Sequence, residues 1–100
     1  MSDDSQVLVP RSFIALFLEP GRSKPNMPRE HIAARHEFCE DLAQMLTEHA
    51  RTKHWELGVT EQDVLERMRL GLLEQDSGVS EAEAAWVVRR LAELLDWPFD

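Results

Sequence analysis

A long segment without helix-breaking residues constrains this chain more than any other feature. After Pro28, no glycine or proline occurs until Gly58. Four residues in between repeat every seven positions: Ile32, Cys39, Leu46 and Lys53. The stripe that they define is widened by Leu42, Ala43, Met45 and Ala50, with Phe38 at its edge. This spacing predicts one amphipathic helix over residues 28–56, with Asn26 as its N-cap and Gly58 as its stop.

The length of this helix raises a second question. About 28 residues at 1.5 Å each give a rod of roughly 42 Å. A compact domain of this size has a radius of gyration of about 13 Å. We therefore expect the helix to bend, to break near residues 47–52, or to project from the domain.

Two further helices are predicted from a start signal that occurs twice. Residues 58–63 (Gly-Val-Thr-Glu-Gln-Asp) are followed 20 positions later by residues 78–83 (Gly-Val-Ser-Glu-Ala-Glu). Thr60 and Ser80 have the character of N-caps, and Glu83 completes a Ser-x-x-Glu capping box. These signals predict helices over residues 61–73 and 81–96. We interpret the similarity as two good helix starts, because two units are too few for a repeat protein.

The N-terminal part predicts a short helix that needs a docking surface. Pro10 suits a first helical turn, and the pair Pro20-Gly21 ends the segment, so we expect a helix over residues 11–19. Apolar side chains cover almost its whole circumference, and so short a helix is marginal in water. It must therefore dock on the core of this chain or on a partner.

Together these segments predict an all-α protein, a small helical bundle of one short N-terminal helix and three longer helices. No segment alternates apolar and polar residues in the manner of a strand. We expect residues 1–9 to form a flexible N-terminal arm and residues 10–100 to form a single helical domain.

Composition excludes several kinds of partner. The chain has 100 residues, with 19 Asp and Glu against 11 Lys and Arg, and a formal net charge of −8. An acidic chain is a poor ligand for nucleic acid, because phosphate contacts dominate that affinity.

The longest apolar run, residues 13–18, is far below the roughly 20 residues that a bilayer span needs. The single Cys39 excludes an internal disulfide, and no export signal opens the chain, so we expect a cytoplasmic protein.

Metal and cofactor sites are not predicted. His31 and His36 are five positions apart, as are His49 and His54, whereas two ligands on one helix face need a spacing of three or four. His36 with Cys39 would supply two ligands, and a structural zinc ion needs about four. No glycine begins a phosphate-binding loop. We therefore expect no metal, no cofactor and no catalytic residue.

Two other functions stay open as alternatives. A small enzyme would need a concave pocket lined by two or more of His31, His36, Glu37 and Glu40. Cys39 is a poor nucleophile in this setting, because nearby carboxylates disfavour its thiolate. A nucleic-acid-binding regulator would use the last two helices, but their connection is too long for a helix-turn-helix. Its reading helix would also begin with acidic residues, leaving Arg89-Arg90 as the basic pair.

Aromatic side chains near both ends of the chain are the candidate binding residues. Phe13 and Phe17 are four positions apart, and Trp86 and Trp97 lie near the other terminus. In one interpretation the first helix packs back on the bundle near Trp97. In the other, these four residues form an exposed apolar surface that binds a helix or a second copy of the chain.

Four short stretches resemble known proteins. They are residues 9–13 (Val-Pro-Arg-Ser-Phe), 20–22 (Pro-Gly-Arg), 39–43 (Cys-Glu-Asp-Leu-Ala) and 78–83. Together they look like a small bacterial family of unknown function, some of whose members are labelled as chaperone-associated ATPases. The chain has no nucleotide-binding loop and is too short for an ATPase domain. The resemblance therefore implies an accessory protein of such a machine and no functional residues.

These observations lead to one functional hypothesis. The chain is expected to be an acidic, helical protein–protein interaction module, an adaptor or chaperone-associated protein, rather than an enzyme. Its partner would be another protein or a second copy, and Phe13, Phe17, Trp86 and Trp97 are the residues expected to contact it.

Overall fold

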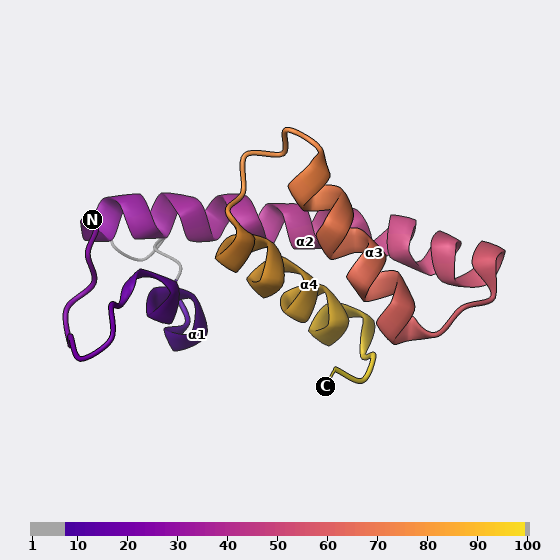
Figure 1. Ribbon diagram of the computed structural model, residues 1–100, viewed down its shortest axis with the longest axis horizontal. Helices are drawn as coiled ribbons and strands as arrows, with labels where there is room; N and C mark the ends of the chain where they lie inside the picture. Colours follow the sequence, from indigo (N-terminus) through magenta and orange to yellow (C-terminus); the bar gives the residue numbers. More distant parts are fainter. Residues whose placement is uncertain (1–7, 100) are drawn as a thin grey trace. The chain divides into compact units, whose positions relative to one another are not determined.

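The computed structural model describes residues 8–99, and all regular structure in that range is helical. A short helix α1 (Arg11–Ile14) continues into the 3-10 turn η2 (Ala15–Phe17). Three longer helices follow, which are α2 (Arg29–Leu57), α3 (Glu61–Glu74) and α4 (Glu81–Leu95) (Figure 1). The predicted all-α bundle, with one short helix and three longer ones, is confirmed.

The chain divides into two compact units, Met1–Phe38 and Cys39–Asp100. The boundary between them falls inside α2. Of the flexible arm predicted for residues 1–9, residues 1–7 lie outside the described part, and Leu8 and Val9 have no regular structure. The single helical domain expected over residues 10–100 stays a prediction, because the two units share one continuous helix.

The N-terminal helix is shorter than predicted. Its first turn is closed by a hydrogen bond that the backbone N–H of Phe13 donates to the carbonyl of Pro10, at 3.0 Å. The turn tightens into η2, and Leu18 is already extended, with φ −101° and ψ 128°. The prediction that the helix reaches residue 19 is therefore wrong. The chain leaves the helical conformation after Phe17, two residues earlier, and enters the connector to α2.

Asn26 does not cap α2, contrary to the prediction. Its backbone N–H donates to the carbonyl of Phe17 at 2.7 Å, and its side-chain amide lies 3.5 Å from Oε2 of Glu19. Asn26 therefore ties the connector back to the end of η2. α2 begins three positions later, at Arg29, directly after Pro28.

Aromatic contacts dock the short helix on the first turns of α2. The ring of Phe13 is fully buried and lies 5.4 Å from the His36 ring in an edge-on arrangement. Phe17 lies 5.6 Å from Phe13 and 6.0 Å, edge-on, from the ring of His31. Within the first unit, α1 and η2 thus pack on the chain itself, which is the first of the two interpretations of this segment. The expected proximity to Trp97 stays a prediction.

α2 runs unbroken for 29 residues. Of the three alternatives that its length left open, the break near residues 47–52 does not occur. Gly58 ends the helix as predicted, with a φ of 67° that an L side chain rarely adopts. Its N–H donates to the carbonyl of His54 at 3.2 Å, which satisfies one of the last open carbonyl groups of α2.

The starts of α3 and α4 follow the predicted capping chemistry. The Thr60 hydroxyl accepts from the backbone N–H of Asp63 at 3.1 Å. Ser80 and Glu83 form a complete capping box, in which each side chain accepts from the backbone N–H of the other, at 3.1 and 3.0 Å. α3 continues through Gly71 and ends at Glu74, one residue beyond the predicted end.

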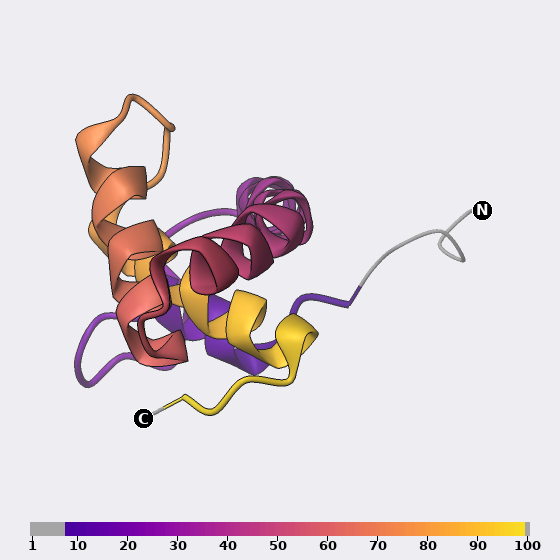
Figure 2. The ribbon, with the colours of Figure 1, turned by 90° about the vertical axis from the view of Figure 1, so that its right-hand side faces the viewer.

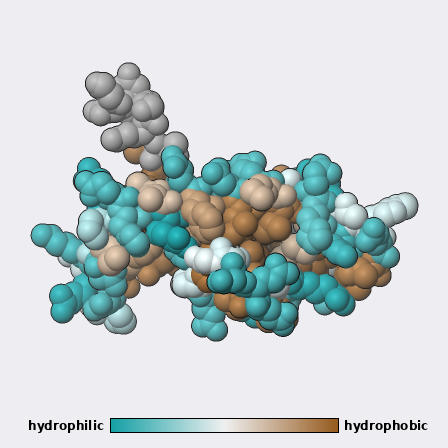
Figure 3. Space-filling view, turned by 90° about the horizontal axis from the view of Figure 1, so that it is seen from above, coloured by the Kyte–Doolittle hydropathy of each residue, from teal (hydrophilic) through white to brown (hydrophobic). Residues whose placement is uncertain are grey.

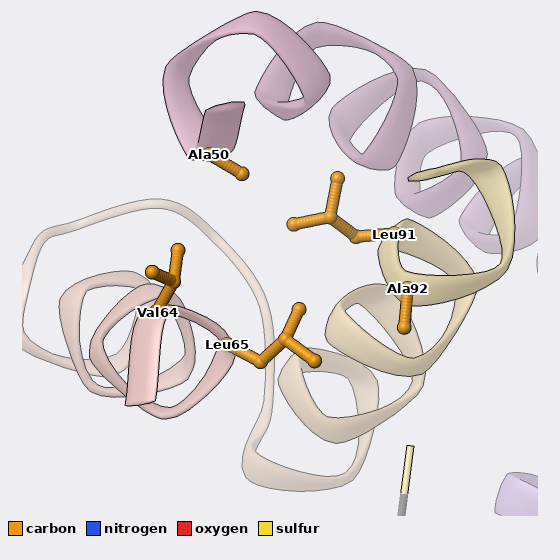
Figure 4. Close-up of a cluster of buried hydrophobic side chains, with 5 residues drawn as sticks. All are labelled: Ala50, Val64, Leu65, Leu91 and Ala92. Atoms are coloured by element: carbon orange, nitrogen blue, oxygen red, sulfur yellow. The ribbon is translucent and has the colours of Figure 1, made fainter. Parts of the chain in front are cut away.

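The second unit has its core where α2, α3 and α4 meet. The buried cluster there consists of Ala50, Val64, Leu65, Leu91 and Ala92. Figure 4 shows Ala50 of α2, Leu65 of α3 and Leu91 of α4 pointing into the space between the three helices. Partly buried side chains surround the cluster, namely Leu46, Val59, Met68, Leu95 and Trp97.

Candidate protein-binding surface

The four predicted partner-binding residues are largely occupied within the chain. Phe13 is fully buried, and Trp86 is 8% exposed. Phe17 and Trp97 are partly buried, and the Trp97 ring lies 5.1 Å from the ring of His54. None of the four therefore offers an open aromatic face, and their assigned role in binding stays a prediction.

The largest exposed apolar side chain of the longer helices is Trp55. It is 86% exposed, and Met45, on the same helix, is 74% exposed. Both lie five positions from Ala50, one on either side. Five positions turn about 140° around an α-helix, so both residues lie on the side of α2 that is turned away from the buried Ala50. We call this side, with Asp41, Met45, Glu48, Thr52 and Trp55, the outer face of α2.

The outer face has no cover from the other helices of its unit. α3 and α4 lie beside α2 (Figure 1, Figure 2), on the side where Ala50 joins their buried side chains (Figure 4). Apolar residues also reach the molecular surface in the view from above, where they gather among hydrophilic ones (Figure 3). The large apolar residues that reach solvent within residues 8–99 are Leu8, Leu18, Met27, Phe38, Met45, Trp55, Leu57, Leu70 and Phe99.

Met45 corrects one part of the predicted stripe. Its neighbours in sequence placed it on the buried side, but its side chain faces solvent. The buried side of α2 is centred on Ala43 and Ala50, which are fully buried. It is therefore narrower than the predicted apolar stripe, which included Met45. Met45 lies two positions from Ala43 and hence about 160° from it around the helix.

Polar contacts on the outer face are local. Glu48 accepts a hydrogen bond from Nη1 of Arg51 at 3.0 Å, one turn along the helix. Both side chains are more than half exposed, so this ion pair contributes little to stability. Met45 and Trp55 are thus separated along the helix by Glu48, whose ion pair with Arg51, at the edge of the outer face, lies within the same helix and can exchange partners.

The residues of the enzyme alternative are engaged in packing and pairing. Arg90 of α4 donates from Nε and Nη2 to the Glu40 carboxylate at 2.9 to 3.1 Å, a partly buried bidentate pair. The hydrogen bonds to Glu40 raise the pKa of the Arg90 guanidinium. His36 packs against Phe13, and His31 against Phe17. These contacts give His31, His36 and Glu40 structural roles, whereas Glu37 is exposed.

The basic pair of the nucleic-acid alternative is also engaged. Arg90 is paired with Glu40 and Glu93, and the Arg89 guanidinium lies over the Phe99 ring, 5.3 Å from its centroid. Among residues 8–99, no three His, Cys, Asp or Glu side chains are grouped so that they could hold a metal ion. In the same range, no helix has the length and apolar character of a bilayer span.

Comparison with family models, curated proteins and solved structures found no match to the chain. The resemblance to the chaperone-associated family therefore stays a prediction. The candidate surface rests on the geometry of α2 alone. Periodicity could have found Trp55, because it lies sixteen positions from Cys39 and hence about 160° from the buried stripe.

Proposed function

We propose that this chain is a protein–protein interaction module of the cytoplasm that binds through the outer face of α2 and has no enzymatic activity of its own. The observation that carries the proposal is the exposure of Trp55, at 86%, on the same face of α2 as an exposed Met45. Tryptophan is among the residues that most often dominate binding energy at protein interfaces. A partner that covers it removes an amphipathic side chain from water.

The free energy available at this position is considerable. An aromatic side chain buries on the order of 200 Å², which at about 25 cal/mol per Å² corresponds to roughly 5 kcal/mol before the costs of association. Retaining a tryptophan in water on a rigid helix gives no such gain to the free chain. The rigid helix also presents the side chain with little loss of backbone freedom on binding.

Charge supports a protein partner rather than nucleic acid. Residues 39–100 hold 14 acidic and 6 basic residues, and thus the whole net charge of −8. A surface on this unit would repel phosphate groups. An adaptor or chaperone-associated role, which the family resemblance implies, would use the same surface.

Affinity purification from native cells tests the proposal. We expect Trp55→Ala to lose the proteins that the unmodified chain captures, because it removes the side chain that they cover. Leu70→Ala is the matched control, since Leu70 is a 44% exposed apolar residue on α3. Capture of the same proteins at the same level by Trp55→Ala would show that the outer face of α2 is not the binding surface.

A further inference from the structure

We propose that the outer face of α2 binds the same face of a second copy, with the two α2 helices antiparallel and Met45 of each copy against Trp55 of the other. This inference rests on the proposed function and names the partner. It follows from the placement of two apolar residues, Met45 and Trp55, and two charged residues, Glu48 and Arg51. When two copies of α2 lie antiparallel, each apolar residue meets the other apolar residue, and each charge meets the opposite charge.

The apolar residues set the register. Met45 and Trp55 are ten positions apart, about 15 Å along the helix axis. If Met45 of one copy lies opposite Trp55 of the other, two-fold symmetry brings the second Trp55 opposite the second Met45. One register thus covers both exposed residues of both copies, in the self-complementary manner of a two-fold interface. A methionine sulfur beside an aromatic ring is itself a favourable contact.

The charged residues fit the same register. Between the apolar contacts, Glu48 of one copy lies opposite Thr52 of the other and next to the other copy's Arg51. Glu48 and Arg51 already form an ion pair within one copy, at 3.0 Å, and both are largely exposed. In the antiparallel pair, each can also bind its counterpart across the interface. The charge pattern therefore places opposite charges together twice.

A parallel arrangement lacks this complementarity. Two parallel helices in register would place Glu48 against Glu48, Arg51 against Arg51 and Asp41 against Asp41. Like charges that face each other across an interface are unfavourable. The antiparallel direction is thus favoured by charge as well as by the apolar contacts.

The test measures association of the intact chain by sedimentation equilibrium, from ~10 µM to ~1 mM, because so short a contact lies at the small end of protein interfaces. We expect the unmodified chain to dimerise in this range. Glu48→Arg and Arg51→Glu, each alone, place like charges together across the interface and should weaken the dimer at least ~10-fold. An equimolar mixture of these two variants should form a heterodimer with about the affinity of the unmodified chain.

Matched controls come from α3. Glu66 and Arg69 form an ion pair of the same three-residue spacing, at 2.6 Å, on a different helix. Glu66→Arg and Arg69→Glu should leave the dimerisation constant unchanged, and circular dichroism would verify that all four variants are folded.

Three results would overturn the proposal. They are an unmodified chain that stays monomeric at ~1 mM, single variants that dimerise as well as the unmodified chain, and a mixture that does not recover the dimer. The failure is distinguishable from that of the proposed function. A monomeric chain whose captured proteins are still lost in Trp55→Ala would refute the second copy and retain the interaction module.

Discussion

At the scale of single residues, Asp96 shows how the last helix ends. It follows α4 directly and has left-handed backbone angles, with φ 58° and ψ 41°. Its N–H donates to the carbonyl of Glu93, and the N–H of Trp97 donates to the carbonyl of Ala92 at 2.9 Å. These two bonds form a Schellman motif, in which the left-handed position is usually glycine. An aspartate there accepts backbone strain and puts negative charge at the negative end of the helix.

Replacing this residue should stabilise the protein. We expect Asp96→Gly to raise the free energy of unfolding by about 1 kcal/mol, because it removes the side-chain strain and the unfavourable charge. Asp96→Asn should raise the free energy of unfolding by a smaller amount, because it removes the unfavourable charge and keeps the backbone strain. Urea unfolding followed by circular dichroism measures both. The opposite change, Gly58→Ala, serves as control and should destabilise, since Gly58 has a φ of 67°. Equal stability of Asp96→Gly and the unmodified chain would contradict the strain argument.

Some residue roles could be predicted from the sequence and others could not. Thr60, Ser80 and Gly58 could, because caps and stops depend on local chemistry that one residue type supplies. Asp96 could not, because aspartate is not the usual residue at its position. The role of Asn26 was wrong for a related reason. An asparagine in a connector has several backbone groups within hydrogen-bonding reach. Here Asn26 bonds to the last residue of η2 and not to the start of α2.

At the scale of elements, α2 shows both the strength and the limit of periodicity. Its bounds were predicted to within one residue at each end, because a segment without glycine or proline leaves few other structures open. Which residues face outward depends on tertiary packing. Small residues such as Ala43 and Ala50 occupy the buried centre, and Met45, about 160° from Ala43 around the helix, lies in solvent. Trp55 was not among the predicted binding residues, although its position about 160° from Cys39 around the helix places it on the outer face.

The N-caps allow a comparison between two helices. We expect Thr60→Ala and Ser80→Ala each to lower the free energy of unfolding by about 1 kcal/mol, because each leaves a backbone N–H of a first helical turn unsatisfied. Glu83→Ala should destabilise as well, through the loss of its bond to the Ser80 N–H.

Thermal unfolding of these variants measures the effects. Ser23→Ala, in the exposed connector before α2, is the control and should leave the midpoint unchanged. A Ser80→Ala variant as stable as the control would show that the capping box does not stabilise α4.

At the scale of the whole molecule, the two compact units differ in charge and in the packing that holds them. Met1–Phe38 contains five acidic and five basic residues, whereas Cys39–Asp100 carries the entire net charge. The first unit depends on a small aromatic group around Phe13, and the second on a core between three helices. So small a packing group makes the first unit sensitive to a single substitution.

Phe13→Ala should release the N-terminal helix. Replacing a fully buried phenylalanine by alanine typically lowers the free energy of unfolding by about 3–5 kcal/mol. The remaining contacts of α1 and η2 do not compensate for a loss of this size. We expect residues 11–17 to lose protection against amide hydrogen exchange, with the amides of α3 as an internal reference. Leu18→Ala, at a 37% exposed position, is the control. Unchanged protection of residues 11–17 would show that Phe13 does not hold this segment.

The placement of the single thiol has a consequence for chemical labelling. Cys39 is the only cysteine of the chain, and its side chain is fully buried. A thiol reagent can therefore react only in molecules that have opened around the middle of α2. Cys39 also lies on the side of α2 away from Trp55, so pairing of two outer faces would not shield it. The rate at which the thiol is labelled thus reports local opening around Cys39, without the need to introduce a cysteine. Self-association through the outer face would not change this rate by covering the thiol.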